Sequence, residues 1–287
     1  KIQIYGKVFI AAKPSSGALL STQKKESIRN SLKSRNTLSI DVEMVDATYM
    51  YIIPTISVRY NPELTSLSAA DLNKKIQNAL ISFETDNLGT FGNKFYSFEM
   101  IEKLKAADVS FISVDADIQL EKRFVPVIDV ISTYQLNFNQ AVYKPHAGHL
   151  GSISSSTFTI DDTTKLAIDH DGYNTLRTFT IDVGDTNIRD LDIGTIDYDT
   201  GIITILNTAI AAFDGSYLSV KMTPKNKNIF GLRNQVLLVS GASITTVNDD
   251  TEEVTSSVGL VATKGVSTTI ITETAVATIG TTLSYSI

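Results

Sequence analysis

The chain has 287 residues, of which 43% are hydrophobic and 20% charged, and it carries a formal net charge of −6. This charge argues against general nucleic-acid binding, because a basic surface is needed to displace counterions from phosphates. The sequence contains no cysteine, which excludes disulfides and thiolate metal sites and fits synthesis in a cytosol. No apolar run approaches the roughly 20 residues that span a bilayer. The chain begins with Lys1 rather than methionine, so we expect a fragment or processed product that lacks an N-terminal part.

The N-terminal stretch predicts a strand, a helix and a second strand. Apolar residues alternate weakly over residues 2–12, and residues 21–35 carry a thin apolar stripe. That stripe consists of Leu20, Ile28 and Leu32, and the basic residues of the predicted helix are Lys24, Lys25, Arg29, Lys33 and Arg35. We interpret the basic residues as a solvated helix face. Residues 38–44 alternate again, and the short Asp46-Ala47 connection predicts a hairpin with the strand that follows.

Residues 46–125 give the clearest pattern in the chain. Period-two alternation predicts strands over residues 49–61 and 109–121, and Pro54 suggests an edge position or a bend in the first. Between them, Ser68 is the predicted N-cap of a helix, and Ser97 that of a shorter one. The residues expected to face inward are Leu72, Ile76, Ala79, Leu80 and Phe83 in the first helix, Phe98, Ile101 and Leu104 in the second, and Ile112, Val114, Ala116, Ile118 and Leu120 in the second strand. Glu121 is expected on the solvent-exposed, wet face of the second strand.

Helical periodicity disappears after Pro126. Short strands are predicted over residues 157–160, 165–168, 176–183, 194–198, 202–206, 217–222 and 236–239. The rest of the chain to Ile287 is rich in threonine and valine, with too few large side chains to form a core alone. The predicted fold class is α+β: an antiparallel sheet covered by helices over residues 1–145, an all-β sandwich- or barrel-like module over residues 146–224, and a Thr-rich β tail over residues 225–287 that packs on the first domain or on a partner.

Residues that could form a catalytic or metal site are better interpreted as loop and turn residues. His146 and His149 lack the additional ligands that a structural metal site needs. Residues 169–172 (DHDG) resemble the start of a calcium loop, but the twelfth position is Thr180 and not a glutamate. The carboxylates Asp182, Asp185, Asp190, Asp192, Asp197 and Asp199 could supply a hydrolase pair, yet aspartate is a common turn residue. No nucleophile motif surrounds Gly151-Ser152 or Ser240-Gly241. We therefore predict no catalytic residue, no metal, no cofactor and no small-molecule substrate.

The predicted 49–61 strand carries three tyrosines. Tyr49, Tyr51 and Tyr60 could stack on bases or sugars. Because both faces of this strand need cover, packing in a core or an interface is the better interpretation.

The order of these elements resembles the J-like baseplate wedge family of contractile phage tails. The matching pieces are residues 54–58 (PTISV), Phe91-Gly92, residues 97–104, and the segment IGTIDYDTGIITI at residues 193–205. Within this family the chain most resembles the C-terminal part of the wedge subunit that forms the inner ring.

The resemblance implies a structural virion protein of the tail baseplate. It implies a homodimer that links wedges into a ring around the hub, contacts other wedge proteins and rearranges when the sheath contracts. It brings no catalytic residue with it. Two alternatives from the residues stay open: a carbohydrate-binding or adhesin module over residues 157–222, and a hydrolase that uses two of the aspartates.

Overall fold

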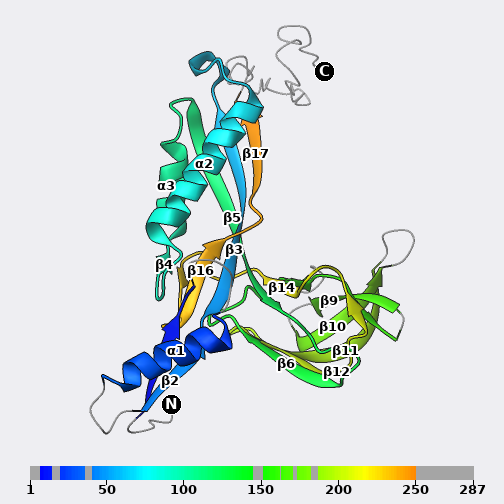
Figure 1. Ribbon diagram of the computed structural model, residues 1–287. Helices are drawn as coiled ribbons and strands as arrows, with labels where there is room; N and C mark the ends of the chain where they lie inside the picture. Colours follow the sequence, from blue (N-terminus) through cyan, green and yellow to red (C-terminus); the bar gives the residue numbers. More distant parts are fainter. Residues whose placement is uncertain are drawn as a thin grey trace, which may run out of the picture.

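The computed structural model describes residues 7–14, 20–35, 41–144, 151–161, 163–170, 173–181 and 187–249. This part of the chain is mostly β, with several sheets and three α-helices. Figure 1 shows two arms that meet at an angle. We call them the helical arm (residues 48–121 and 229–248) and the β arm (residues 132–222).

A small β-α-β unit lies at the foot of the helical arm (Figure 1). Strands β1 (Lys7–Ala12) and β2 (Asp41–Asp46) pair in parallel, and helix α1 (Thr22–Lys33) crosses between them. The predicted hairpin between β2 and the next strand is therefore wrong. Only Ala47 separates these two strands, whereas a tight hairpin needs two loop residues and a parallel pair needs a crossover such as α1.

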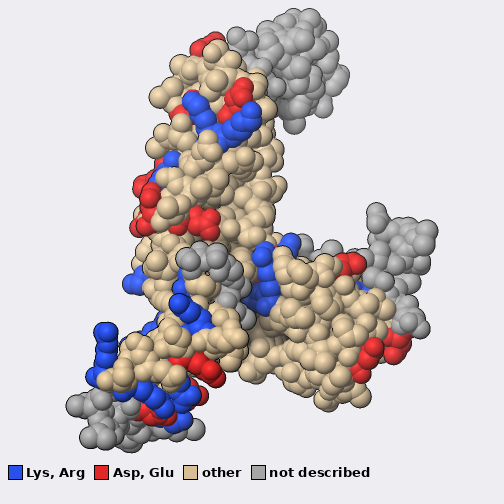
Figure 2. All heavy atoms as spheres, viewed as in Figure 1, with Lys and Arg blue, Asp and Glu red and all other residues tan. Residues whose placement is uncertain are grey.

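Helix α1 has the thin apolar stripe that the sequence predicts. Ile28 and Leu32 are half-buried, and no residue of the helix is fully buried. Part of its basic surface is neutralised by β2, because Lys25 lies 2.5 Å from a carboxylate oxygen of Asp46 and Lys33 lies 3.5 Å from one of Asp41. Figure 2 shows the basic side chains gathered at this foot.

Strand β3 (Thr48–Tyr60) is the centre of the helical arm. It pairs antiparallel with β5 (Phe111–Phe124) on one edge, and in parallel with β16 (Gln235–Val239) and β17 (Ser243–Asn248) on the other. Its buried residues are Met50, Ile52, Pro54, Ile56 and Val58. The sheet of this arm therefore adds two parallel pairings to the antiparallel pair that the alternation predicts.

Pro54 lies inside this central strand and not at a sheet edge. The carbonyl of Ile52 accepts a hydrogen bond from the backbone N–H of Ser240, so the backbone of Pro54, two residues further on, faces the same neighbour. That neighbour is interrupted there, since β16 ends opposite Ile52 and β17 begins opposite Thr55. The missing proline N–H thus faces the gap between two strands, where no ladder bond is lost.

Helix α2 (Ala69–Asn87) covers the sheet as predicted (Figure 1). The hydroxyl of Ser68 accepts a hydrogen bond from the backbone N–H of Asp71 at 3.2 Å, which makes Ser68 the N-cap. Four residues of the predicted stripe are buried: Leu72, Ile76, Leu80 and Phe83. The turn after the helix leads to β4 (Lys94–Phe95), which pairs with β15 (Ile229–Phe230).

Helix α3 (Ser97–Lys105) departs from the prediction in two respects. Its N-cap is Tyr96, which makes no side-chain cap bond, and Ser97 is already helical. Met100 and Leu104 are buried, whereas Phe98 is 54% exposed. Because Phe98 stands two residues before Met100, about 200° around the helix, it cannot share the inward stripe that Met100 and Leu104 define.

Strand β5 follows the predicted alternation at Ala116, Ile118 and Leu120, which are buried, but not at its start. Tyr60 pairs with Phe111 and Arg59 with Ser113, so Ile112 is an extra residue in the ladder, as in a β-bulge. The bulge changes the face of the preceding residue. Phe111 is therefore buried and Ile112 is 41% exposed, against the prediction.

The β arm continues the sheet through β5. The last residues of β5 pair with β14 (Leu218–Met222), and the path then runs through β7, β9, β10, β11 and β12 to β6. The bounds are β6 Ser132–Asn137, β7 Ile153–Ser155, β8 Phe158–Ile160, β9 Thr163–His170, β10 Tyr173–Ile181, β11 Asn187–Asp197, β12 Ile202–Thr208 and β13 Ala212–Phe213. Each predicted short strand overlaps one of these or β16. A closed sandwich or barrel stays a prediction.

The hairpin of β11 and β12 joins the predicted strands 194–198 and 202–206 by a tight turn after Asp197. The carboxylate of Asp197 accepts from the backbone N–H groups of Asp199 and Thr200, at 3.0 and 3.2 Å. Gly201 has φ +70°, and a Cβ there would lie 2.1 Å from the carbonyl oxygen of Gln140. The turn therefore requires glycine on both counts.

The predicted divisions at residues 145 and 224 remain predictions. Strand β6, which precedes residue 146, pairs with β12. Strands β16 and β17, which follow residue 225, pair with β3. Most of the predicted Thr-rich tail, from residue 250 on, lies outside the described residues.

We predict that Phe83→Ala lowers the free energy of unfolding by about 3 to 5 kcal/mol, because it leaves a cavity under α2. Phe83 is 1% exposed, and its ring meets that of Phe95 edge-on at 6.0 Å. Urea denaturation measures the change. The control is Phe98→Ala, which removes the same ring from an exposed position and should cost less than about 1 kcal/mol. Equal losses in the two variants would contradict the packing described above.

A second prediction concerns Asp108, in the turn before β5. Its carboxylate accepts from Lys75 at 2.6 Å and from the backbone and hydroxyl of Ser110, and these bonds lower its pKa from 3.8 to about 2. Because the folded pKa is lowered, the stabilisation is complete above pH 3.8 and disappears as the pH falls through about 2.

Asp108→Asn should therefore lower the free energy of unfolding by about 1 kcal/mol at neutral pH. The difference from the wild type should shrink as the pH falls below 4, which denaturation at a series of pH values measures. Asp117→Asn is the control, since the Asp117 side chain is 80% exposed beside Lys227 and its loss should be small throughout. A pH-independent deficit for Asp108→Asn would contradict the assignment.

Candidate functional site

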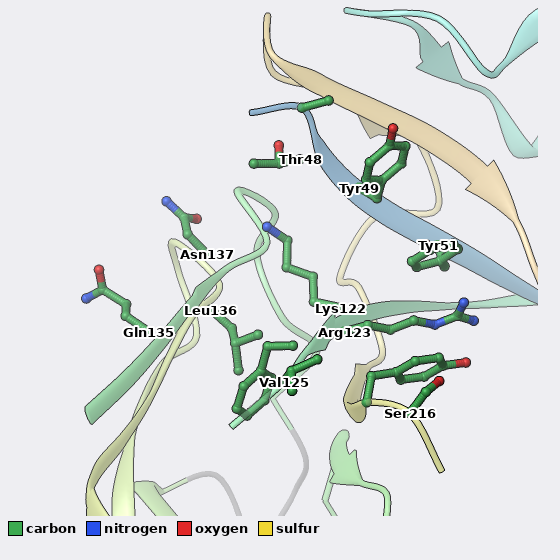
Figure 3. A pocket seen from close by; sticks show the side chains of 13 residues that line it. Thr48, Tyr49, Tyr51, Lys122, Arg123, Val125, Gln135, Leu136, Asn137 and Ser216 are labelled. Carbon is green, nitrogen blue, oxygen red and sulfur yellow. The ribbon is translucent and has the colours of Figure 1, made fainter. Parts of the chain in front are cut away.

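A pocket of about 650 Å³ lies where the two arms meet, and Figure 3 shows it from close by. We call it the junction pocket. It is lined by the start of β3, the end of β5, strand β6 and the residues before β14: Ala47, Thr48, Tyr49, Tyr51, Lys122, Arg123, Phe124, Val125, Gln135, Leu136, Asn137, Ser216 and Tyr217. The pocket exists because β5 leaves its pairing with β3 at Tyr51 and continues along β14.

Arg123 holds the wall of the pocket together. Its guanidinium lies over the ring of Tyr51 at 3.7 Å and over the ring of Tyr217 at 4.6 Å. Figure 3 shows Tyr51 and Arg123 beside each other. It also donates to the hydroxyl of Ser240 at 2.9 Å and forms an ion pair with Glu121. One side chain thus joins β5, β3, the approach to β14 and the loop between β16 and β17.

Glu121 is the counter-ion of Arg123 and is 5% exposed. The sequence prediction placed it on the wet face of its strand, which is wrong, because at this point Glu121 is bound by Arg123 and lies opposite Tyr51, whose ring also contacts that guanidinium. Burial alone would lower the pKa of the Arg123 guanidinium, but the hydrogen bond and the charge of Glu121 outweigh it and raise that pKa. Arg123 and Glu121 therefore form a neutral pair with little remaining charge for a ligand.

Lys122 differs from Arg123 in having no such counter-ion. Its side chain is partly buried, and that burial lowers the pKa of its ammonium group. The ring of Phe138 lies 5.9 Å from Nζ. Within the described part of the chain, no carboxylate forms an ion pair with it. Figure 3 shows the ammonium group in the pocket, on the side of Thr48 and Asn137.

The tyrosines singled out in the sequence are only partly brought together. Tyr49 and Tyr51 both line the junction pocket, whereas Tyr60 lies at the other end of β3 and packs on the core. Burial, and then the neighbouring Tyr51, raise the pKa of the Tyr49 phenol. Tyr60 therefore packs on the core as predicted, whereas Tyr49 and Tyr51 both contribute to the wall of the pocket, Tyr51 with its ring against Arg123.

The predicted metal and carboxylate candidates do not form a site in the described residues. His146, His149, Asp171, Gly172, Asp182 and Asp185 lie outside the described residues, and the side chains of Asp169, His170 and Asp190 do as well. Of the others, Asp192 forms an ion pair with Arg177 at 2.9 Å, and Asp197 holds its own turn. In the parts that the structure describes, no three histidine or acidic side chains are placed to hold a metal ion. Nor is any helix there long and apolar enough to cross a membrane.

Sequence reasoning missed Lys122, Arg123 and Tyr217. A signal for the first two was present in residues 121–123 (EKR), three charged residues in succession inside a strand that otherwise alternates apolar and polar residues. Strict alternation cannot place all three in water, so at least one must be partly buried. Tyr217 gave no comparable signal, because its role depends on the pairing of β14 with β5.

Comparison with known proteins finds similarity in the N-terminal part of the chain. Residues 48–123 match a family model described as "Baseplate structural protein gp6, C-terminal domain III". Residues 2–45 match a second model, "Baseplate structural protein gp6, C-terminal domain I". Residues 48–121 of the helical arm and the unit at its foot are therefore similar to domains of a baseplate structural protein, and residues 122 and 123 of the junction pocket lie within the first match.

A particular relative is the baseplate wedge protein gp6 of Enterobacteria phage T4. It is 31% identical over 115 residues, which is 40% of this chain and 17% of the T4 protein. The comparison thus covers less than a fifth of the relative. It agrees with the resemblance to a wedge subunit, while the J-like family name stays a prediction.

We predict that Arg123→Ala lowers the free energy of unfolding by about 3 to 5 kcal/mol, because it leaves the buried Glu121 without a cation. Thermal or urea denaturation measures the loss. The double variant Arg123→Met with Glu121→Gln should recover most of it, since no unpaired charge remains.

Arg59→Ala is the control for Arg123→Ala. Arg59 forms an exposed ion pair with Asp249 at 3.4 Å, so its removal should cost less than about 1 kcal/mol. If the Arg123 variant cost no more than the Arg59 variant, the central position of Arg123 would be contradicted.

Proposed function

We propose that this chain is part of a structural subunit of a phage tail baseplate and that it associates with a second copy of itself. The similarity of residues 2–45 and 48–123 to baseplate structural proteins supports the first statement. The second rests on a surface of the described structure, the loop between β5 and β6.

The observation that carries the proposal is the exposure of this loop, residues 125–131, which we call the apolar loop. Five of its seven side chains are aliphatic and exposed: Val125 67%, Val127 57%, Ile128 41%, Val130 48% and Ile131 72%. Soluble monomers rarely expose so many adjacent apolar side chains. An apolar surface of this kind is typical of a protein that buries it against another chain.

The apolar loop is held in place by its backbone. The N–H of Val127 donates to the hydroxyl of Tyr134 at 3.0 Å, and that of Asp129 donates to the carbonyl of Ile210 at 2.9 Å. The aliphatic side chains are therefore presented on a fixed scaffold. Little conformational entropy is lost when a partner covers them.

The apolar surface continues onto the β arm. Ile131 lines a second cavity of about 320 Å³ together with Leu191 and Leu206, which are 46% and 42% exposed. A cavity beside projecting aliphatic side chains is self-complementary, because each of two copies can insert a side chain into the cavity of the other. This supports a symmetric contact.

In the assembly, the proposed dimer contributes to linking wedges into a ring around the hub. The subunit contacts other wedge proteins there, and it takes part in the rearrangement that accompanies sheath contraction. It is made in the host cytoplasm and acts in the virion, and it has no catalytic role. The sugar-binding alternative was placed over residues 157–222, and the apolar loop gives it no support, because the exposed side chains of this loop are aliphatic and not the aromatic rings on which sugars stack.

The proposal predicts a dimer of the full 287-residue chain in solution, measured by size-exclusion chromatography with light scattering over a concentration series. Val127→Asp and Ile131→Asp each bury a charge in the contact. Each should weaken dimerisation at least about thirtyfold, the equivalent of about 2 kcal/mol.

The matched control is Ile81→Asp, at a position of α2 that is 61% exposed but remote from the apolar loop in the sequence and in Figure 1. Its dimerisation should match that of the wild type. A wild-type monomer at every concentration, or equal weakening by Ile81→Asp, would overturn the proposed self-contact.

A further inference from the structure

Lys122 is the feature of the junction pocket that the packing of the two arms does not explain. Arg123, its neighbour, is paired with Glu121 and clamped by two rings. Lys122 instead presents a partly buried ammonium group to the pocket with no carboxylate beside it among the described residues. We propose that the junction pocket binds the carboxylate of an aspartate or glutamate side chain from another protein chain, and that Lys122 is its cation.

The charge of the pocket wall fits one negative charge. The Glu121–Arg123 pair is neutral, and Asp46, just before the lining residue Ala47, is paired with Lys25 at 2.5 Å. This leaves the single positive charge of Lys122. A carboxylate matches it, whereas the second charge of a phosphate group would be left uncompensated.

Asn137 supplies a second hydrogen-bond donor. Its Oδ1 accepts from the backbone N–H of Asn139 at 2.8 Å, which fixes the orientation of the amide. Its Nδ2 group is therefore left as a donor at the edge of the pocket. A carboxylate has two acceptor oxygens, one for the ammonium of Lys122 and one for this amide, and Figure 3 shows both side chains on the same side of the pocket.

Much of the remaining wall is apolar and fits the hydrocarbon part of a side chain. Leu136 is 7% exposed, and Phe124, Val125 and the ring of Tyr49 also line the pocket. A free inorganic anion would gain nothing from these contacts, whereas the methylene groups of an acidic side chain would be buried against them. These contacts favour a carboxylate that belongs to a polypeptide.

Burial of Lys122 also explains why the site is ready to bind. The same loss of hydration that lowers the pKa of its ammonium makes a carboxylate partner more stabilising than it would be for a lysine in water. Binding should therefore raise the pKa of Lys122. The inference rests on the proposed function only for the idea that a neighbouring chain of the assembly supplies the carboxylate.

The test is a titration of the full chain followed by the NMR signals of the lysine ε-methylene groups. The probe is N-acetyl-aspartate N-methylamide, and the controls are its asparagine analogue, which is uncharged, and inorganic phosphate. The signal of Lys122 is the one missing from Lys122→Met. It should shift and saturate in the low millimolar range with the aspartate probe alone, while the signal of the exposed Lys105 does not saturate.

Two variants refine the result. Lys122→Met should abolish binding, as followed on the amide signals of β6, and Asn137→Ala should weaken it about fivefold, the equivalent of one hydrogen bond. The proposal would be overturned if the aspartate probe failed to saturate the Lys122 signal. It would also be overturned if the asparagine analogue shifted that signal equally, or if phosphate bound more tightly than the aspartate probe.

The titration is repeated on the Ile131→Asp chain, which separates this proposal from the proposed dimer. Saturable binding by this variant and a light-scattering mass of a monomer would support the pocket independently of the apolar loop. A wild-type monomer would contradict the proposed self-contact, and the titration would still decide the pocket.

Discussion

The two arms of this protein depend on one buried interaction, the pairing of Arg123 with Glu121 between the rings of Tyr51 and Tyr217. Strand β5 is shared by both arms, and at this point it exchanges one neighbour for another. A shared strand alone would act as a hinge, because two sheets joined by one backbone can twist about it. The guanidinium prevents this by contacting side chains from β3, from the approach to β14 and from the loop after β16.

The choice of arginine at this position follows from what the joint requires. A planar guanidinium can stack on two rings and still donate hydrogen bonds in its own plane, to Glu121 and to Ser240. A lysine ammonium has no plane to stack. The neighbouring residue shows the contrast. Lys122 projects into the junction pocket (Figure 3), whereas the guanidinium of Arg123 is bound by Glu121 and Ser240.

The surfaces proposed to bind other chains lie directly after this joint. Lys122 and Val125 line the junction pocket, and the apolar loop begins at Val125 and ends at Ile131, beside the second cavity. A partner that contacts this region touches both arms and the loop between them. It would therefore be sensitive to their relative orientation, which agrees with the proposed part of this subunit in a rearranging assembly.

The sequence by itself determined the local elements: the period of β3, the inward stripe and N-cap of α2, and the hairpin after Asp197 are all readable from spacing and turn chemistry. It also supported the resemblance to a wedge subunit. Pairing partners were not readable, as the wrong hairpin at Ala47 and the bulge at Ile112 show. Glu121, Lys122 and Tyr217 acquire their roles only where β14 meets β5, nearly 100 residues apart in the sequence. The local sequence pattern indicates which face of a strand is apolar. Only the tertiary structure decides which side chains surround a charged residue and which charge has no counter-ion.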